Sequence, residues 1–128
     1  MEIRGIGVDI IEIVRIRKTV EKFGKKFLSR IFHPEEIPSS PGTYWENLAG
    51  RFAGKEAVMK VLQKEGVGWK DIRILKEPHG SPYVELLGKG KEVALKLGVE
   101  KIFLTISHDG GIAFAFAIGV RSGKSDRT

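Results

Sequence analysis

The segment IAFAFAIGV, residues 112–120, alternates large and small side chains without a break. Successive side chains of a β-strand point to opposite faces, whereas a helix would mix the two kinds on one surface. The segment is therefore predicted to be a strand with two unlike faces. The bulky face is Ile112, Phe114, Phe116 and Ile118, and the small face is Ala113, Ala115, Ala117 and Gly119. We expect the bulky face to fill a core and the small face to let another backbone approach, commonly a helix and otherwise another subunit.

Hydrophobic periodicity and turn residues divide the rest of the chain into helical and extended segments. In order, the predicted elements are a strand at 3–11, a helix at 14–28 interrupted by Gly24, a loop at 33–42, a helix at 44–64, a hairpin of strands at 71–77 and 82–87, a helix at 89–98 and a strand at 101–108. This order predicts a single α+β domain, residues 1–121, with a largely antiparallel sheet. Residues 122–128 are expected to form a frayed C-terminal tail.

The composition limits the classes to which the protein can belong. The chain has 128 residues, enough for one domain with a modest core. It contains no cysteine, which excludes disulfides, thiolate metal sites and a cysteine nucleophile. No apolar run approaches the roughly 20 residues of a membrane span, and the N-terminus does not resemble a secretory signal. We therefore expect a cytoplasmic protein.

The positive charge of the chain is concentrated in one segment. The formal net charge is +6, and residues 15–30 alone hold seven basic residues against one acidic residue. The remainder of the chain is neutral. The local excess of positive charge therefore predicts that one polyanionic partner binds to the helix at 14–28, which we call the basic helix. A lysine-rich helix face that only contacts solvent is the alternative.

Two carboxylates occupy positions where apolar residues would be expected. Asp9 shares a strand face with Gly5 and Gly7, and Glu56 lies within GRFAGKEAVMK, residues 50–60, on the same side of its helix as Phe52 and Lys60. A buried carboxylate needs a cation or hydrogen-bond donors. Asp9 and Glu56 could together hold a divalent cation such as Mg²⁺ (or Mn²⁺), with Lys60 facing a phosphate. A surface pair between Glu56 and Lys60 explains part of the same pattern.

Ser107 and His108 lie at the end of a predicted strand, next to a glycine turn. Strand ends and loops commonly meet ligands, although a surface histidine is the simpler interpretation. The sequence supports no Ser-His-Asp triad, and it contains no GxxxxGK[ST] phosphate loop.

Three motifs occur together, and their combination is more specific than any one of them. GIGVDIIEIVRI lies at the start of the chain, RFAGKEAVMK in the middle and ISHDGGIAFAFA near the end. In this order they closely resemble the holo-[acyl-carrier-protein] synthase family, the short phosphopantetheinyl transferases. The resemblance implies that Asp9 and Glu56 bind Mg²⁺ and that Asp9, Glu56 and Lys60 form the catalytic set. It also implies a coenzyme A site formed by Arg51, Lys55, Lys60, Gly80, Pro82, Ser107 and His108.

The reaction implied by the resemblance moves 4′-phosphopantetheine from coenzyme A to a serine of apo acyl carrier protein and releases 3′,5′-ADP, in support of fatty acid biosynthesis. Acyl carrier proteins are acidic, so Arg15, Lys22 and Lys25 on the basic helix are the expected docking residues. The resemblance further implies a homotrimer with sites between subunits, because longer members of the superfamily carry two copies of this unit. The alternatives are a small nucleic-acid-binding module that uses the basic helix, and a metal-dependent phosphohydrolase that uses Asp9 and Glu56.

Three positions depart from the pattern of the family. Gly54 stands where alanine is common, and Asp109 follows the Ser-His pair where threonine is common. Ser81 lies between Gly80 and Pro82 where many relatives have lysine, so a cationic contact from that position is in doubt.

Overall fold

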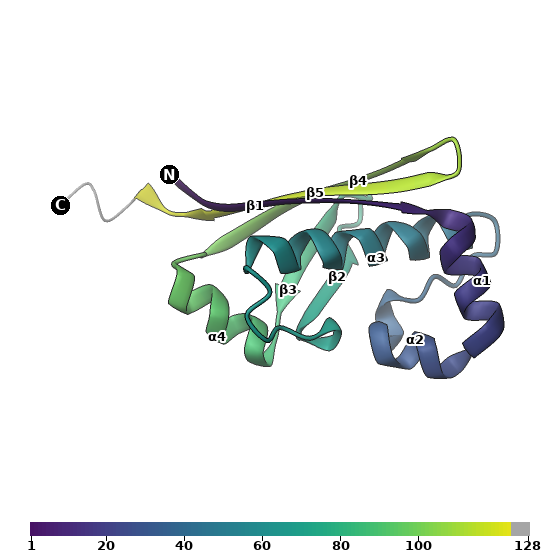
Figure 1. Ribbon diagram of the computed structural model, residues 1–128. Helices are drawn as coiled ribbons and strands as arrows, with labels where there is room; N and C mark the ends of the chain where they lie inside the picture. The colour runs from purple at the N-terminus through teal and green to yellow at the C-terminus, as the bar shows by residue number, and fades with distance from the viewer. Residues whose placement is uncertain (124–128) are drawn as a thin grey trace.

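The computed structural model describes residues 1–123, which form an α+β fold (Figure 1). Its elements are β1 Glu2–Glu12, α1 Ile13–Phe23, α2 Lys25–Ile31, η1 Pro34–Glu36, α3 Tyr44–Val61, η2 Trp69–Asp71, β2 Ile72–Lys76, β3 Pro82–Leu86, α4 Gly88–Leu97, β4 Lys101–Asp109 and β5 Ile112–Arg121. The elements η1 and η2 are single turns of 3-10 helix. The predicted fold class and the order of the major helices and strands are confirmed.

The strands form two antiparallel sheets. The first has the order β1-β5-β4, and the second is the hairpin of β2 and β3. Helix α3 runs along one face of the three-stranded sheet, with the hairpin beside it and in contact with β4, α4 near the C-terminal end of α3, and α1 and α2 near its N-terminal end (Figure 1). The prediction of a largely antiparallel sheet is therefore confirmed.

Small residues bring α3 against the three-stranded sheet. Ala113, Ala115 and Ala117 on β5 are buried against α3. On β1, a Cβ added to Gly7 would lie 2.1 Å from the carbonyl oxygen of Ala57, so only glycine permits this approach. The small face of β5 therefore packs on a helix of the same chain. The alternative that another subunit covers this face is wrong, because α3 already occupies it.

The opposite face of the same sheet is apolar and exposed, which contradicts the expectation that the bulky side chains of β5 fill the core of this chain. The exposed fraction is 41% for Phe116 and 67% for Ile10. We call this surface the exposed apolar sheet face; it consists of Ile6, Val8, Ile10, Phe103, Ile112, Phe114 and Phe116. Within residues 1–123 no second layer covers this face, because every helix with substantial contacts to the sheet packs on its other side.

The helix boundaries differ in detail from those predicted. Gly24, with φ of 57°, divides the first predicted helix into α1 and α2, at the residue where an interruption was predicted. The next helix ends at Val61 rather than near residue 64, because Gln63 and Lys64 adopt φ values of 58° and 52°, which belong to the left-handed region. The loop predicted at 33–42 contains the short helix η1.

The C-terminal residues of the described chain are still tied to the fold. Ser122 donates its backbone N–H to Glu100 at 2.7 Å. Residues 124–128 of the predicted tail lie outside the described residues. Among residues 1–123, none of the helices has the length and apolar character needed to cross a bilayer.

Candidate active site

The structure brings Asp9 and Lys60 together. Asp9 lies on the face of β1 that meets α3, and its side chain is only 17% exposed. The ammonium of Lys60 donates to the carbonyl oxygen of Val8 at 2.7 Å and lies 3.7 Å from Oδ1 of Asp9. Burial raises the pKa of the Asp9 carboxyl, and the nearby positive charge of Lys60 opposes this shift. The side chain of Lys60 remains 42% exposed, so it can also reach a ligand.

Glu56 lies one helical turn before Lys60. It is partly buried, and within residues 1–123 its carboxylate makes no hydrogen bond or ion pair. Asp9 and Glu56 line a common cavity of about 360 Å³, with Arg15, Phe27 and Phe52 also in its wall. We call it the acidic cavity. The predicted alternative of a surface pair between Glu56 and Lys60 is wrong, because Lys60 is paired with Asp9 instead.

The acidic cavity fits a hard cation that keeps part of its shell for substrate and water. The described residues contain no group of three or more His, Cys, Asp or Glu side chains that could enclose a metal. Mg²⁺ commonly takes one or two carboxylates and completes its coordination with phosphates and water. The free carboxylate of Glu56, facing the same cavity as Asp9, matches this donor set.

Most of the residues predicted to bind coenzyme A lie at a different cavity. Arg51, Gly80, Pro82 and His108 line a cavity of about 210 Å³ between the N-terminal half of α3, the β2–β3 hairpin and the end of β4. We call it the hairpin cavity. None of Asp9, Glu56 and Lys60 belongs to it.

Ser107 does not join His108 at the hairpin cavity. The two residues are consecutive on β4, so their side chains point to opposite faces of the strand. Ser107 is paired with Phe114 and lies on the side of the exposed apolar sheet face, whereas His108 lines the hairpin cavity. One chain therefore cannot present both side chains to a ligand in that cavity.

Lys76 is a residue of the hairpin cavity for which the sequence analysis predicted no role. It lines the hairpin cavity, where its ammonium donates to Oδ1 of Asn47 at 2.9 Å. Burial lowers the pKa of Lys76, and the positive charge of Arg51 lowers it further. Lys76 is paired with Pro82 across the hairpin, so it lies close to Ser81. The register of the predicted hairpin could have revealed this placement.

Lys55 does not have the position predicted for a coenzyme A contact. Its side chain has no exposed surface, and its ammonium lies 2.8 Å from Oε1 of Glu36. It also donates to the carbonyl oxygens of Trp69 at 2.9 Å and Ile72 at 2.6 Å. Three oxygen partners use all three protons of an ammonium. Lys55 therefore has no donor left for a ligand, contrary to the prediction.

The predicted docking residues lie on α1 and α2. Arg15 lines the acidic cavity, so the basic helix begins beside Asp9 and Glu56. Lys22 is exposed and lies over the ring of Phe23, and Lys25 is exposed at the start of α2. Within the described part of the chain, none of these three residues forms an ion pair. Their charges are therefore available to an acidic partner.

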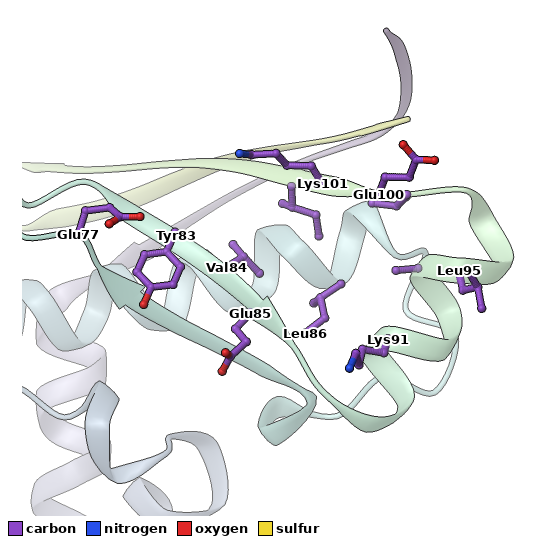
Figure 2. Close-up of a pocket in the computed structure, with 12 residues that line it drawn as sticks. Glu77, Tyr83, Val84, Glu85, Leu86, Lys91, Leu95, Glu100 and Lys101 are labelled. Carbon is purple, nitrogen blue, oxygen red and sulfur yellow. The ribbon is translucent and has the colours of Figure 1, made fainter. Parts of the chain in front are cut away.

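A large groove contains none of the predicted site residues. It has a volume of about 820 Å³ and lies between β3, α4 and the start of β4, with Val84 and Leu86 in its wall (Figure 2). Glu85 pairs with Arg73, and Leu95 lies exposed at the rim. Size alone therefore does not identify the functional site of this molecule.

Comparison with known proteins gives one consistent family. The model of the 4′-phosphopantetheinyl transferase superfamily matches residues 5–117. The holo-[acyl-carrier-protein] synthase of Halothermothrix orenii is 39% identical over 122 residues, which cover 91% of this chain and 97% of the relative.

Solved structures agree with this assignment. The crystal structure of holo-ACP-synthase from Plasmodium yoelii matches with a TM-score of 0.81 and 35% identity, over 94% of this chain and 96% of that one. The Helicobacter pylori enzyme in complex with coenzyme A matches with a TM-score of 0.79 and 36% identity, over 90% and 99%. The motifs, the fold and these similarities show that the chain is an enzyme of the holo-[acyl-carrier-protein] synthase family.

Proposed function

We propose that the protein transfers 4′-phosphopantetheine from coenzyme A to a serine hydroxyl of apo acyl carrier protein. The observation that carries this proposal is the acidic cavity, where Asp9, Glu56 and the first arginine of the basic helix meet. The serine oxygen forms a bond to the phosphorus that carries pantetheine. The bond from this phosphorus to the bridging oxygen of the pyrophosphate breaks, and 3′,5′-ADP leaves with the electron pair.

At the acidic cavity the acidic residues would hold the metal, and the basic residue Lys60 would contact the phosphate. Asp9 and Glu56 would hold Mg²⁺, which when bound neutralises negative charge on the pyrophosphate. Lys60 is held by Val8 and Asp9 with part of its ammonium exposed, so it can donate to a phosphate oxygen. Glu56 has no partner within the described residues and can accept the proton of the carrier serine. No covalent bond to the protein is needed.

We propose that the nucleotide end of coenzyme A binds in the hairpin cavity, through Arg51, Gly80, Pro82 and His108. This cavity and the acidic cavity share no lining residue, and we infer that a complete site places the acidic cavity of one subunit beside the hairpin cavity of the next. A homotrimer would provide such pairs by cyclic closure. The exposed apolar sheet face would supply the buried contact between subunits.

The basic helix gives the carrier protein a docking surface next to the chemistry. Arg15, Lys22 and Lys25 would contact its acidic helix, and Arg15 would also bring the acceptor serine near Glu56. A role in fatty acid biosynthesis and a cytoplasmic location follow from this partner and remain predictions.

A mass measurement tests the function directly. The purified protein is incubated with coenzyme A, MgCl₂ and apo acyl carrier protein, and the carrier is then weighed intact. We expect a gain of one phosphopantetheine group, and no gain when the acceptor serine is replaced by alanine. Release of phosphate without modification of the carrier would instead indicate a phosphohydrolase. Binding of nucleic acid with no transfer would indicate the binding module.

A further inference from the structure

A buried glutamate organises the wall of the hairpin cavity. Glu36, in η1, has no exposed surface although it lies within the turn-rich segment 33–42. Its Oε1 accepts the backbone N–H of His33 at 2.8 Å and lies 2.8 Å from the ammonium of Lys55. Its Oε2 accepts the backbone N–H of Ile74 at 2.7 Å. Both carboxylate oxygens therefore have partners, and the charge is balanced within the core by Lys55.

The same glutamate controls both partners that orient Arg51. The Nη1 atom of Arg51 donates to the backbone carbonyl of Glu36 at 2.8 Å, and its Nε atom donates to the carbonyl of Ile74 at 3.1 Å. Ile74 is the residue whose N–H is bound by the Glu36 carboxylate. Glu36, Ile74 and Arg51 thus form a closed ring of hydrogen bonds that fixes the plane of the guanidinium.

One edge of that guanidinium remains free. Nη2 of Arg51 has no hydrogen-bond partner within residues 1–123. No buried side-chain nitrogen or oxygen in this part of the chain lacks a partner, so Nη2 must reach solvent. Arg51 lines the hairpin cavity with Lys76 and His108, and this free edge is the part available to a ligand there. Burial also lowers the pKa of Arg51, and the charge of Glu36 opposes the shift.

We propose that Glu36 is a positioning residue, which holds the free edge of Arg51 toward the anionic end of coenzyme A through its own carbonyl and through Ile74. The proposal rests on binding of the nucleotide in the hairpin cavity. Glu36 does not touch the substrate itself. Its loss should weaken nucleotide binding while the chemistry at the acidic cavity proceeds at its normal rate.

The experiment compares Glu36→Gln with Glu35→Gln. Glu35 is the neighbouring residue of the same turn, and its carboxylate pairs with Arg73 at the surface. We expect Glu36→Gln to raise the dissociation constant for 3′,5′-ADP and the KM for coenzyme A by about tenfold, the size of one charged hydrogen bond. The kcat and the KM for carrier protein should stay within about twofold. Glu35→Gln should change none of these values.

Two further variants separate positioning from stability. The variant Glu36→Gln leaves the ammonium of Lys55 buried without its ion-pair partner. The double variant Glu36→Gln/Lys55→Met removes that charge, so its thermal stability should exceed that of Glu36→Gln. Its KM for coenzyme A should stay raised. In an Arg51→Met background, Glu36→Gln should have no further effect on nucleotide binding. A KM that recovers together with stability, or an equal effect in both backgrounds, would overturn the proposal.

Binding measurements on the unaltered protein distinguish failure of the proposed function from failure of the proposed role of Glu36. If the unaltered protein binds neither coenzyme A nor 3′,5′-ADP, the proposed function falls and the role of Glu36 falls with it. If the unaltered protein binds both and Glu36→Gln binds them equally well, only the role of Glu36 is refuted.

Discussion

Charged side chains of this protein acquire their roles from their immediate partners. Lys55 and Glu56 are adjacent in the chain, yet Lys55 is fully buried against Glu36, and Glu56 has no partner within the described residues. The difference follows from helix geometry, since consecutive residues point about 100° apart. One therefore faces the core beside η1, and the other faces β1 and the acidic cavity.

Removal of either carboxylate of the acidic cavity should abolish most of the activity. We expect Asp9→Ala and Glu56→Ala each to lower kcat/KM by roughly a hundredfold or more, because each removes one of two protein ligands for the metal. Circular dichroism should show an unchanged fold. Glu92→Ala, on the exposed side of α4, is the matched control. Full activity in the presence of EDTA would remove the metal from the proposal.

Lys76 should supply the cationic contact that Ser81 cannot provide. We expect Lys76→Met to raise the KM for coenzyme A by about tenfold, because a phosphate loses a charged donor. Adding Ser81→Lys to this variant should restore part of the affinity, since position 81 lies beside the same cavity. Lys91→Met on α4 is the control for loss of one positive charge. An unchanged KM in Lys76→Met would place Lys76 outside the binding site.

At the level of elements, α3 connects the two cavities and carries residues of both. Phe52 and Glu56 line the acidic cavity, whereas Gly50 and Arg51 line the hairpin cavity. The position of α3 depends on how closely β1 and β5 approach it. Glycines and alanines on those strands set the distance.

Gly7 is the position where this approach is tightest. A Cβ at residue 7 would meet the backbone of Ala57, which cannot move without displacing α3. We expect Gly7→Ala to lower the free energy of unfolding by about 3 kcal/mol, as overpacking of a core does. Urea denaturation measures this loss. Gly42→Ala is the control, because a Cβ there would meet no atom within 4 Å. Equal midpoints for the two variants would contradict this account of the packing.

A charge reversal on the basic helix, which the structure divides into α1 and α2, should affect the use of one substrate only. We expect Arg15→Glu to raise the KM for acyl carrier protein by about tenfold or more, and the KM for coenzyme A to change by less than about threefold. The effect should shrink at high salt, because exposed charges are screened. Lys89→Glu, the same reversal on α4, is the control. Equal increases in both KM values would place Arg15 in the nucleotide site instead.

At the level of the whole molecule, residues 1–123 present two separate cavities and an apolar sheet face that no other described element covers. Phe114, Phe116 and their neighbours are exposed on the side that α3 leaves bare. Exposed apolar surface of this extent is typical of contact between proteins. A trimer would bury it and would pair each acidic cavity with a neighbouring hairpin cavity.

Complementation between two inactive variants tests this arrangement. Asp9→Ala and His108→Ala are denatured and refolded together, so that mixed trimers form. Some interfaces then pair an intact Asp9 with an intact His108 from the next subunit, and activity should return. Either variant refolded alone should stay inactive. Light scattering that shows a single chain would refute the trimer, and confirmed mixed trimers without activity would place both residues in one subunit's site.

The sequence alone determined most of the secondary structure of this protein and the order of its elements. Strict alternation in residues 112–120, the glycines at positions 5 and 7 and the apolar stripes of the helices depend on neighbours along the chain. They were enough to predict the fold class and most element positions. The three motifs were enough to identify the family. Asp9 and Glu56 were predicted as partners because each lies at an otherwise apolar position of its element.

Only the tertiary structure decided that the bulky face of β5 is left uncovered and which cations are free. Burial is a property of contacts between distant segments, so alternation in β5 predicted a helix against the alanines but could not show that the phenylalanines stay exposed. In the same way, Lys55 resembled a ligand-binding lysine until Glu36, 19 residues away, was found against its ammonium. A charged group binds a ligand or stabilises the core according to what the fold places beside it.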